Sequence, residues 1–183
     1  TADNGSDGFD LIHTEMPDVV VTDVLMSKMD GYELCRKIKT DVLLSHIPVV
    51  ILTAKVTDQD KITGYQEGAD VYMTKPFNPT LLQTVIDNLL TSRSKLRDMI
   101  LSESGKSDAG TEAETVKLSA ADRAFVDKLR GLIDSNISDS TLNINALSGE
   151  MCMSRASFFR KIKSLTGVTP NNFILIYRLN KAA

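Results

Sequence analysis

The sequence of 183 residues predicts an α/β domain built on a parallel sheet, followed by an all-α domain. Short β-branched runs alternate with helical patterns through the first half, an order typical of a parallel sheet covered by helices. The second half contains helical patterns alone. Charge separates the same two parts, because residues 1–92 carry 7 Lys and Arg against 14 Asp and Glu, whereas residues 117–183 carry 10 against 5. We therefore expect two domains with different partners, the basic one suited to a polyanion such as nucleic acid.

Composition excludes several other classes of protein. Hydrophobic residues make up 42% of the chain and charged residues 25%, which is ordinary for a globular protein with a core. Cys35 and Cys152 lie far apart and outside any CxxC pair, which argues against a zinc cluster or a disulfide framework. The longest aliphatic stretch, about Val49–Leu52, is far shorter than the roughly 20 residues of a membrane span. Residues 1–17 are too polar for a signal peptide.

A polar stretch near the middle of the chain predicts a linker. Residues 102–115 read SESGKSDAGTEAET, with no large apolar residue. Such a stretch cannot bury enough surface to offset the entropy of ordering it. We expect a first domain over residues 1–100, a linker over 101–116 and a second domain over 117–183.

The first domain is predicted to contain three strands and four helices. Buried β-branched runs predict strands over Val19–Thr22, Val49–Thr53 and Val71–Met73. Asp30 suits a helix N-cap, and Gly68 suits the residue that follows a helix. The expected helices are Gly5–Glu15, Gly31–Lys39, Asp58–Glu67 and Pro79–Leu101, the last with an apolar stripe of Leu82, Val85, Ile86 and Leu89.

The second domain is predicted to contain four helices. Ser154 is a suitable N-cap, Gly167 suits a helix end, and Pro170 suits the first turn of a helix. The expected helices are Ala120–Ser135, Asn143–Met151, Ser154–Thr166 and Pro170–Ala182.

Three polar residues stand at or just after the carboxyl ends of the predicted strands. Asp23 follows the first strand, Thr53 ends the second and Lys75 follows the third. In open parallel sheets, ligands bind beyond these ends. If the strands are neighbours, a carboxylate, a hydroxyl and an ammonium converge. That combination suits phosphoryl transfer to Asp23 as nucleophile, with Lys75 and Thr53 holding the phosphoryl oxygens and a divalent cation neutralising the remaining charge.

These residues lie in motifs that resemble a known family. The segments VVVTDVLMSKMDGYELCRKIK, ILTAK and GADVYMTKPF are similar, in order and spacing, to the signatures of two-component receiver domains. The resemblance implies that Asp23 accepts phosphate from a histidine kinase, in cis or in trans, and that Lys75 contacts the phosphoryl group. It implies Mg²⁺ bound by Asp23 and the Leu25 carbonyl, a switch pair of Thr53 and Tyr72, and a cis bond between Lys75 and Pro76.

The chain departs from the receiver pattern in two places. Ser27 stands where the family usually has proline. Receivers also begin with a strand that ends in two acidic residues, whereas this chain begins at TADNG, which is similar to a later part of the fold. We therefore expect a receiver-like sheet with its first strand and helix missing, an incomplete metal site, and a chain that is part of a longer protein. A dehalogenase-type phosphatase is excluded, because it needs a second acid two residues after the nucleophile, where Leu25 stands.

The basic half shows the offsets of a helix-turn-helix. Phe158, Ile162 and Leu165 are spaced as a buried stripe. This predicts an outward cluster that can reach base edges and phosphates of DNA, formed by Arg155, Ser157, Arg160 and Lys161. The segment SRASFFRKIKSLTGVTPNNFI resembles the first helix-turn-helix of AraC-type transcription regulators, and the helix that follows is similar to their linker helix. The second helix-turn-helix of that family has no counterpart here, and Cys152 replaces the usual glycine of the turn.

Together the two resemblances imply a phosphorylation-regulated transcription factor. We expect double-stranded DNA and a histidine kinase as partners, homodimers formed through the receiver, and no small-molecule substrate. The chain resembles hybrid sensors most, in which the longer protein carries a histidine kinase, although stand-alone regulators combine the same domains. This chain itself is not expected to be an enzyme, and we expect it on the cytoplasmic side. The alternative is a dimerisation or docking module that is never phosphorylated.

Overall fold

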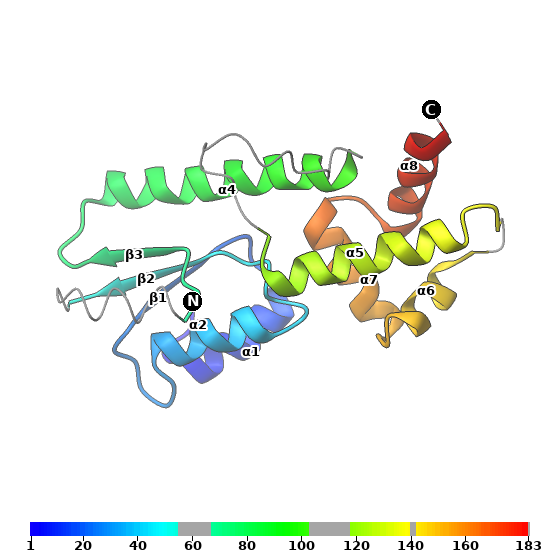
Figure 1. Cartoon of the computed structure of the whole chain (residues 1–183). Coiled ribbons are helices and arrows are strands. Elements are labelled where there is room, and N and C mark those ends of the chain that lie inside the picture. Colours follow the sequence, from blue (N-terminus) through cyan, green and yellow to red (C-terminus); the bar gives the residue numbers. More distant parts are fainter. Residues whose placement is uncertain (55–66, 103–117, 140–141, 183) are drawn as a thin grey trace. The chain divides into compact units, whose positions relative to one another are not determined.

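A computed structural model describes residues 1–54, 67–102, 118–139 and 142–182 (Figure 1). The chain divides into two compact units, Thr1–Thr91 and Ser92–Ala183. The expected helix over Asp58–Glu67 and the expected linker fall almost entirely on residues outside the described ranges. Among the helices that the structure describes, none combines the length and the apolar character that crossing a bilayer requires.

The first unit contains a three-stranded parallel sheet. Strands β1 (Val20–Asp23), β2 (Val49–Thr53) and β3 (Val71–Thr74) pair in the order β1-β2-β3. Each strand lies within one residue of its predicted limits, so the expected α/β class with a parallel sheet is confirmed. Helices α1 (Gly5–Glu15) and α2 (Gly31–Thr40) lie together on one side of the sheet (Figure 1). The core of this unit lies between them and the sheet, around Ile38, Leu44, Val49 and Ile51.

A polar side chain caps the amino-terminal end of each of these helices. The Asn4 side chain accepts a hydrogen bond from the Asp7 amide at the start of α1, and Asp30 accepts one from Glu33 at the start of α2. Gly31 lies so close to the end of β1 that a Cβ there would overlap the Asp23 carbonyl. The Gly31 amide donates to the Val24 carbonyl at 3.0 Å. A residue without a side chain is therefore required where α2 meets the end of the strand that carries Asp23.

After β3, the predicted cis peptide bond between Lys75 and Pro76 is present, and helix α4 runs from Pro79 to Leu101. The expected apolar stripe of α4 is only half-buried, because Leu82, Val85, Ile86 and Leu89 are of intermediate exposure. The one fully buried residue of α4 is Ile100, near its carboxyl end.

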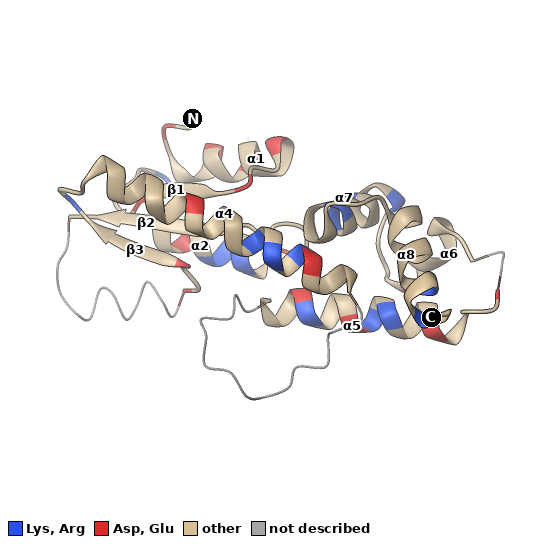
Figure 2. Ribbon diagram, turned by 90° about the horizontal axis from the view of Figure 1, so that it is seen from above, with Lys and Arg blue, Asp and Glu red and all other residues tan. Residues whose placement is uncertain are grey.

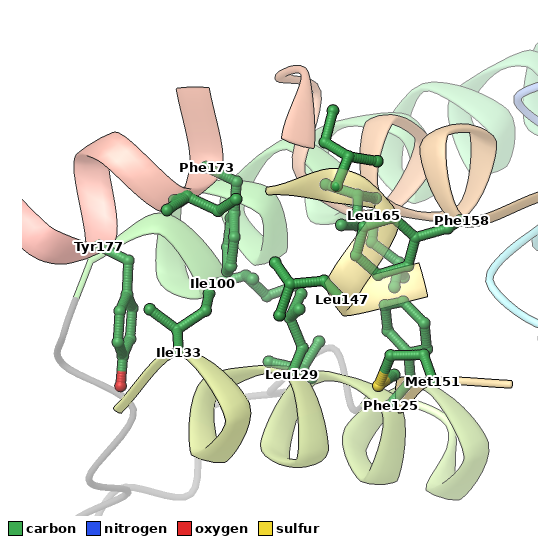
Figure 3. Packing of buried hydrophobic residues seen from close by; sticks show 14 residues of the cluster. Ile100, Phe125, Leu129, Ile133, Leu147, Met151, Phe158, Leu165, Phe173 and Tyr177 are labelled. Atoms are coloured by element: carbon green, nitrogen blue, oxygen red, sulfur yellow. The ribbon is translucent and has the colours of Figure 1, made fainter. Parts of the chain in front are cut away.

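The second unit is helical throughout the part that the structure describes. Its helices are α5 (Ala120–Ser135), α6 (Ile144–Glu150), α7 (Arg155–Thr166) and α8 (Pro170–Ala182). Ser119, Asn143 and Ser154 cap α5, α6 and α7, and α7 ends at Gly167 in the left-handed conformation. The core lies between these helices (Figure 3), and its largest fully buried side chains include Phe158, Phe173, Leu129, Ile133, Leu147 and Ile162.

The last ten residues of α4 belong to this second unit. Ile100 is part of its core (Figure 3), and Leu96 and Leu101 pack against that core. Arg130 on α5 donates to the Ile100 carbonyl at 2.8 Å, and Asn180 on α8 donates to the Leu101 carbonyl at 3.0 Å. The composition of the sequence predicts that the first domain ends at residue 100, because the polar stretch that follows is the local signal of a domain boundary. The structural division lies before Ser92, since the apolar residues after it pack within the helical unit.

We predict that Ile100→Ala destabilises the helical unit by about 2–5 kcal/mol, because it leaves a cavity in a packed core. Native-state hydrogen exchange of the α5 and α7 amides measures this directly. Met99→Ala is the matched control, since Met99 is exposed and its truncation is expected to change stability by less than about 0.5 kcal/mol. Equal effects of the two variants would show that the end of α4 is not part of this core.

Candidate functional site

The parallel register brings three predicted residues to one edge of the sheet. Asp23 ends β1 and pairs in register with Leu52, while Thr53 ends β2 and pairs with Thr74. Lys75 follows β3, and its amide donates to the Thr53 carbonyl at 2.6 Å. Its ammonium lies 2.5 Å from Asp23 Oδ2. A carboxylate, a hydroxyl-bearing residue and a cation therefore meet where the three strands end.

The electrostatics of this edge keep Asp23 ionised. The hydrogen bond from Lys75 lowers the pKa of the Asp23 carboxyl below its ordinary value of 3.8, with smaller contributions from the Lys75 charge and from the Leu25 and Val24 amides. Partial desolvation of the carboxyl acts in the opposite direction and is outweighed. Both partners stay reachable from solvent, since the side chains of Lys75 and Asp23 are 38% and 37% exposed. An ionised, accessible carboxylate is the form that can act as a nucleophile.

Tyr72 lies on β3 beside a residue that sequence reasoning did not single out. The hydroxyls of Tyr72 and Tyr32 are 2.7 Å apart, and the two rings stack with centroids 6.5 Å apart. Tyr32 is the second residue of α2, directly after the glycine that packs on the end of β1. Its partner lies 40 residues later in the chain, and no local sequence signal connects the two.

Receiver domains generally bind Mg²⁺ at their phosphorylation site, and the residues of this edge match such a site only in part. Mg²⁺ prefers oxygen ligands and is usually held by one or two carboxylates together with water. The described residues supply the Asp23 carboxylate, one oxygen of which lies against Lys75 while the other accepts a hydrogen bond from the Leu25 amide at 3.4 Å. Within the described ranges, no three His, Cys, Asp or Glu side chains come together as a group that could hold a metal ion.

In the helical unit, α6 and α7 are joined by a tight turn. Cys152 in this turn has a φ of 55°, in the left-handed region that favours glycine. The Met153 amide donates to the Ser148 carbonyl at 2.9 Å, and Ser148 is buried where the helices meet. Phe158, Ile162 and Leu165 form the buried stripe of α7 that the spacing predicts.

The predicted outward cluster on α7 is only partly exposed. Arg155 and Arg160 are exposed, and Figure 2 shows basic residues along α7. Ser157 is half-buried, and its amide and hydroxyl both contact the Ser154 hydroxyl at the helix start. Ser157 therefore contributes to the N-cap of α7.

The expectation that Lys161 faces outward is wrong. Its side chain is 1% exposed, and its ammonium lies 2.5 Å from Asp122 Oδ1 in α5. Lys161 is three residues after Phe158 and four before Leu165, so it lies at the border of the buried stripe. Lys161 is buried because Asp122, on another helix, neutralises its charge. The sequence of α7 alone contains no sign of this partner.

Lys163 is an exposed basic residue that the sequence analysis did not include. It follows Arg160 by three residues, which places both on the same face of a helix. The spacing of Phe158, Ile162 and Leu165 already contained this information, because Lys163 falls opposite that stripe.

Comparison with known proteins agrees with the geometry of the sheet edge. Residues 1–87 match the response regulator receiver domain family. Over 186 residues the chain is 32% identical to a probable transcriptional regulator, ycf29, of Pyropia yezoensis, which covers all of this chain and 82% of that protein. The chain therefore belongs to the response regulators of two-component signalling.

Two further similarities concern proteins of different length. The chain is 36% identical over 182 residues to Histidine kinase P4 of Formosa agariphila, which is all of this chain but 13% of that protein. The receiver domain of the Francisella response regulator 1452 is 33% identical, with a TM-score of 0.46 over 49% of this chain and 73% of that one. The chain thus spans most of one relative and a small part of another.

We predict that Lys75→Met raises the pKa of the Asp23 carboxyl, because the largest cause of its low value is removed. A carbon-detected NMR titration of Asp23 measures the change. A pKa that is lower in the folded state than in the unfolded state adds to the free energy of unfolding above pH 3.8. This stabilisation is lost as the pH falls through the folded-state pKa. The Lys75→Met variant lacks the contact, so its free energy of unfolding should fall less on acidification than that of the wild type.

Lys28→Met is the control for this titration. Lys28 pairs with Asp7 at 3.4 Å, so its loss should leave the pKa of Asp23 where it is. An unchanged pKa in Lys75→Met would mean that the contact between Lys75 and Asp23 does not persist in solution.

Proposed function

We propose that this chain is the output part of a phosphorylation-controlled transcription regulator, in which Asp23 accepts phosphate and the helical unit binds DNA. The observation that carries the proposal is the meeting of Asp23, Thr53 and Lys75 where the three parallel strands end. Family membership supports it, because receiver domains interact with histidine kinases.

The proposed chemistry follows from the groups at this edge. An oxygen of the Asp23 carboxylate attacks the phosphorus of a phosphohistidine, the phosphorus–nitrogen bond breaks, and the imidazole leaves with its electron pair and takes up a proton. An acyl phosphate forms on Asp23. Lys75, already 2.5 Å from the carboxylate, stabilises the charge on the phosphoryl oxygens as they approach. The Thr53 hydroxyl donates to one of these oxygens.

The proposed response to phosphate involves Thr53 and Tyr72. A phosphoryl group carries more negative charge than the carboxylate that it modifies, so it draws donors toward it. Movement of the Thr53 side chain leaves space beside β3, and the Tyr72 ring turns toward it. The surface around β3 then changes, and homodimers form through the receiver.

The proposed DNA contact uses α6, the turn and α7 as a helix-turn-helix of the AraC type. α7 begins at a serine N-cap after a tight turn and presents Arg155, Arg160 and Lys163 to solvent. Basic residues at the start of such a helix can reach phosphates and base edges in the major groove. A dimer would place two such helices on repeated half-sites.

We further propose that the chain comes from a hybrid sensor, in which one longer protein carries a histidine kinase and this output part. The support is the similarity to Histidine kinase P4, which extends over the whole of this chain. Among the described residues, no three His, Cys, Asp or Glu side chains gather at this edge to hold a metal ion, which favours a second candidate function, a docking module that is not phosphorylated.

An Asp23→Asn variant of the protein that carries this chain distinguishes the two functions. The amide keeps the size of the side chain but cannot form an acyl phosphate. We predict that a small-molecule phosphodonor strengthens binding to a DNA duplex in the wild type and leaves Asp23→Asn unchanged, as measured by fluorescence anisotropy.

Asp10→Asn is the matched control, because Asp10 is an exposed carboxylate on α1. It should respond to the phosphodonor as the wild type does. An equal response in Asp23→Asn would reject the phosphorylation mechanism in favour of the docking module. If the wild type binds no duplex even at low salt, the DNA-binding role is rejected.

A further inference from the structure

The helical unit contains a charged pair that is removed from solvent. Lys161 on α7 and Asp122 on α5 are 1% and 2% exposed, and their charged atoms are 2.5 Å apart. The second carboxylate oxygen of Asp122 accepts a hydrogen bond from the Ser119 hydroxyl at 2.8 Å. The Lys161 ammonium also lies 6.0 Å from the centre of the Phe125 ring. The pair thus ties the middle of α7 to the first turn of α5.

Stability alone does not account for such a pair. Two charges lose much of their hydration when they are buried, and a well-packed apolar pair of the same size is often as stable or more so. Removing one partner is strongly destabilising, because the other charge is left buried without compensation. A buried ion pair is best explained where it selects one arrangement among several of similar packing energy.

Apolar packing alone leaves such alternatives open, because contacts between apolar side chains are not directional. The buried stripe of α7 includes Phe158, Ile162 and Leu165. Lys161 lies at the border of this stripe, where a small rotation moves it toward solvent or away from Asp122. The ion pair forms only at one rotational setting.

We infer that the Lys161–Asp122 pair is a positioning contact that fixes the rotation of α7 against α5 and thereby sets which side chains α7 presents to DNA bases. This inference rests on the proposed DNA-binding function. Lys161 itself does not touch DNA in this arrangement, and it acts through Arg155, Arg160 and Lys163.

The rotation of α7 about its axis is important for base recognition. The side chains of a helix end about 5–6 Å from its axis, so a rotation of about 20° moves their tips by about 2 Å. A shift of that size breaks a hydrogen bond to a base edge. Contacts to the backbone phosphates depend on charge and tolerate the shift better. The pair should therefore matter for sequence preference more than for total affinity.

The test replaces the whole pair in the full chain. The double substitution Asp122→Leu with Lys161→Met places two apolar side chains at these buried positions and removes both charges. The probes are a duplex that the wild-type chain selects from a random-sequence pool and a mixed-sequence duplex of equal length. We expect affinity for the selected duplex to fall by about ten-fold or more and affinity for the mixed-sequence duplex to change by less than about two-fold. Circular dichroism checks that the variant is folded.

The matched control is Asp127→Leu with Lys128→Met, which also removes one negative and one positive charge, but from exposed positions of α5. This control should keep the preference of the wild type. Lys161→Arg, which keeps a cation opposite Asp122, should keep it as well. If the first double variant does not fold, Asp122→Asn with Lys161→Met is tested in its place, with the same expected loss of preference.

Three outcomes would overturn the inference. A folded double variant that keeps the full preference for the selected duplex would show that the pair has no positioning role. Failure of both double variants to fold would show that the pair serves folding itself. A wild-type chain that prefers no duplex would reject the proposed DNA-binding function, and the inference with it, which distinguishes that failure from the other two.

Discussion

The candidate site depends on the parallel pairing of β1, β2 and β3. Parallel strands run in the same direction, so their carboxyl ends meet at one edge, and the register decides which residues face each other there. Asp23, Thr53 and Lys75 are 30 and 22 residues apart in the chain, yet the pairing brings them together. Gly31 contributes by allowing α2 to start directly against the end of β1. A change in the register of β1 would separate the carboxylate from its cation.

Two of the ion pairs among the described residues illustrate different uses of the same chemistry. Asp23 and Lys75 are each more than one third exposed, so water and an incoming phosphoryl group can reach both charges. Their attraction is screened, and the pair can open at little cost. Lys161 and Asp122 are almost completely buried, so their separation would leave charges without hydration. The first pair is suited to a site that changes state, and the second is suited to a fixed arrangement of helices.

The fold was largely predictable from the sequence because its signals are local. The N-caps Asp30 and Ser154, the glycine at position 167 and the β-branched runs mark elements that the structure places within one or two residues of the expected limits. The meeting of the three strand ends was also predictable, since it needs only the rule for parallel sheets. These inferences depend on neighbouring residues or on a general property of the fold.

The features that were not predictable depend on contacts between distant residues. Lys161 resembled a surface lysine because its partner, Asp122, lies 39 residues earlier on another helix. Tyr32 gave no signal because its contact with Tyr72 forms only when α2 packs beside β3 in the folded unit. The end of α4 was assigned to the first domain because composition shows where a linker begins and does not show which core Ile100 enters.

The central claim is that Asp23 is the residue that receives phosphate. Phosphopeptide mapping by mass spectrometry, after the protein that carries this chain is incubated with a small-molecule phosphodonor, tests it most directly. The account predicts one phosphate on the peptide that contains Asp23, released by alkali and by hydroxylamine as an acyl phosphate is. Phosphate on another peptide, or on none, would contradict it.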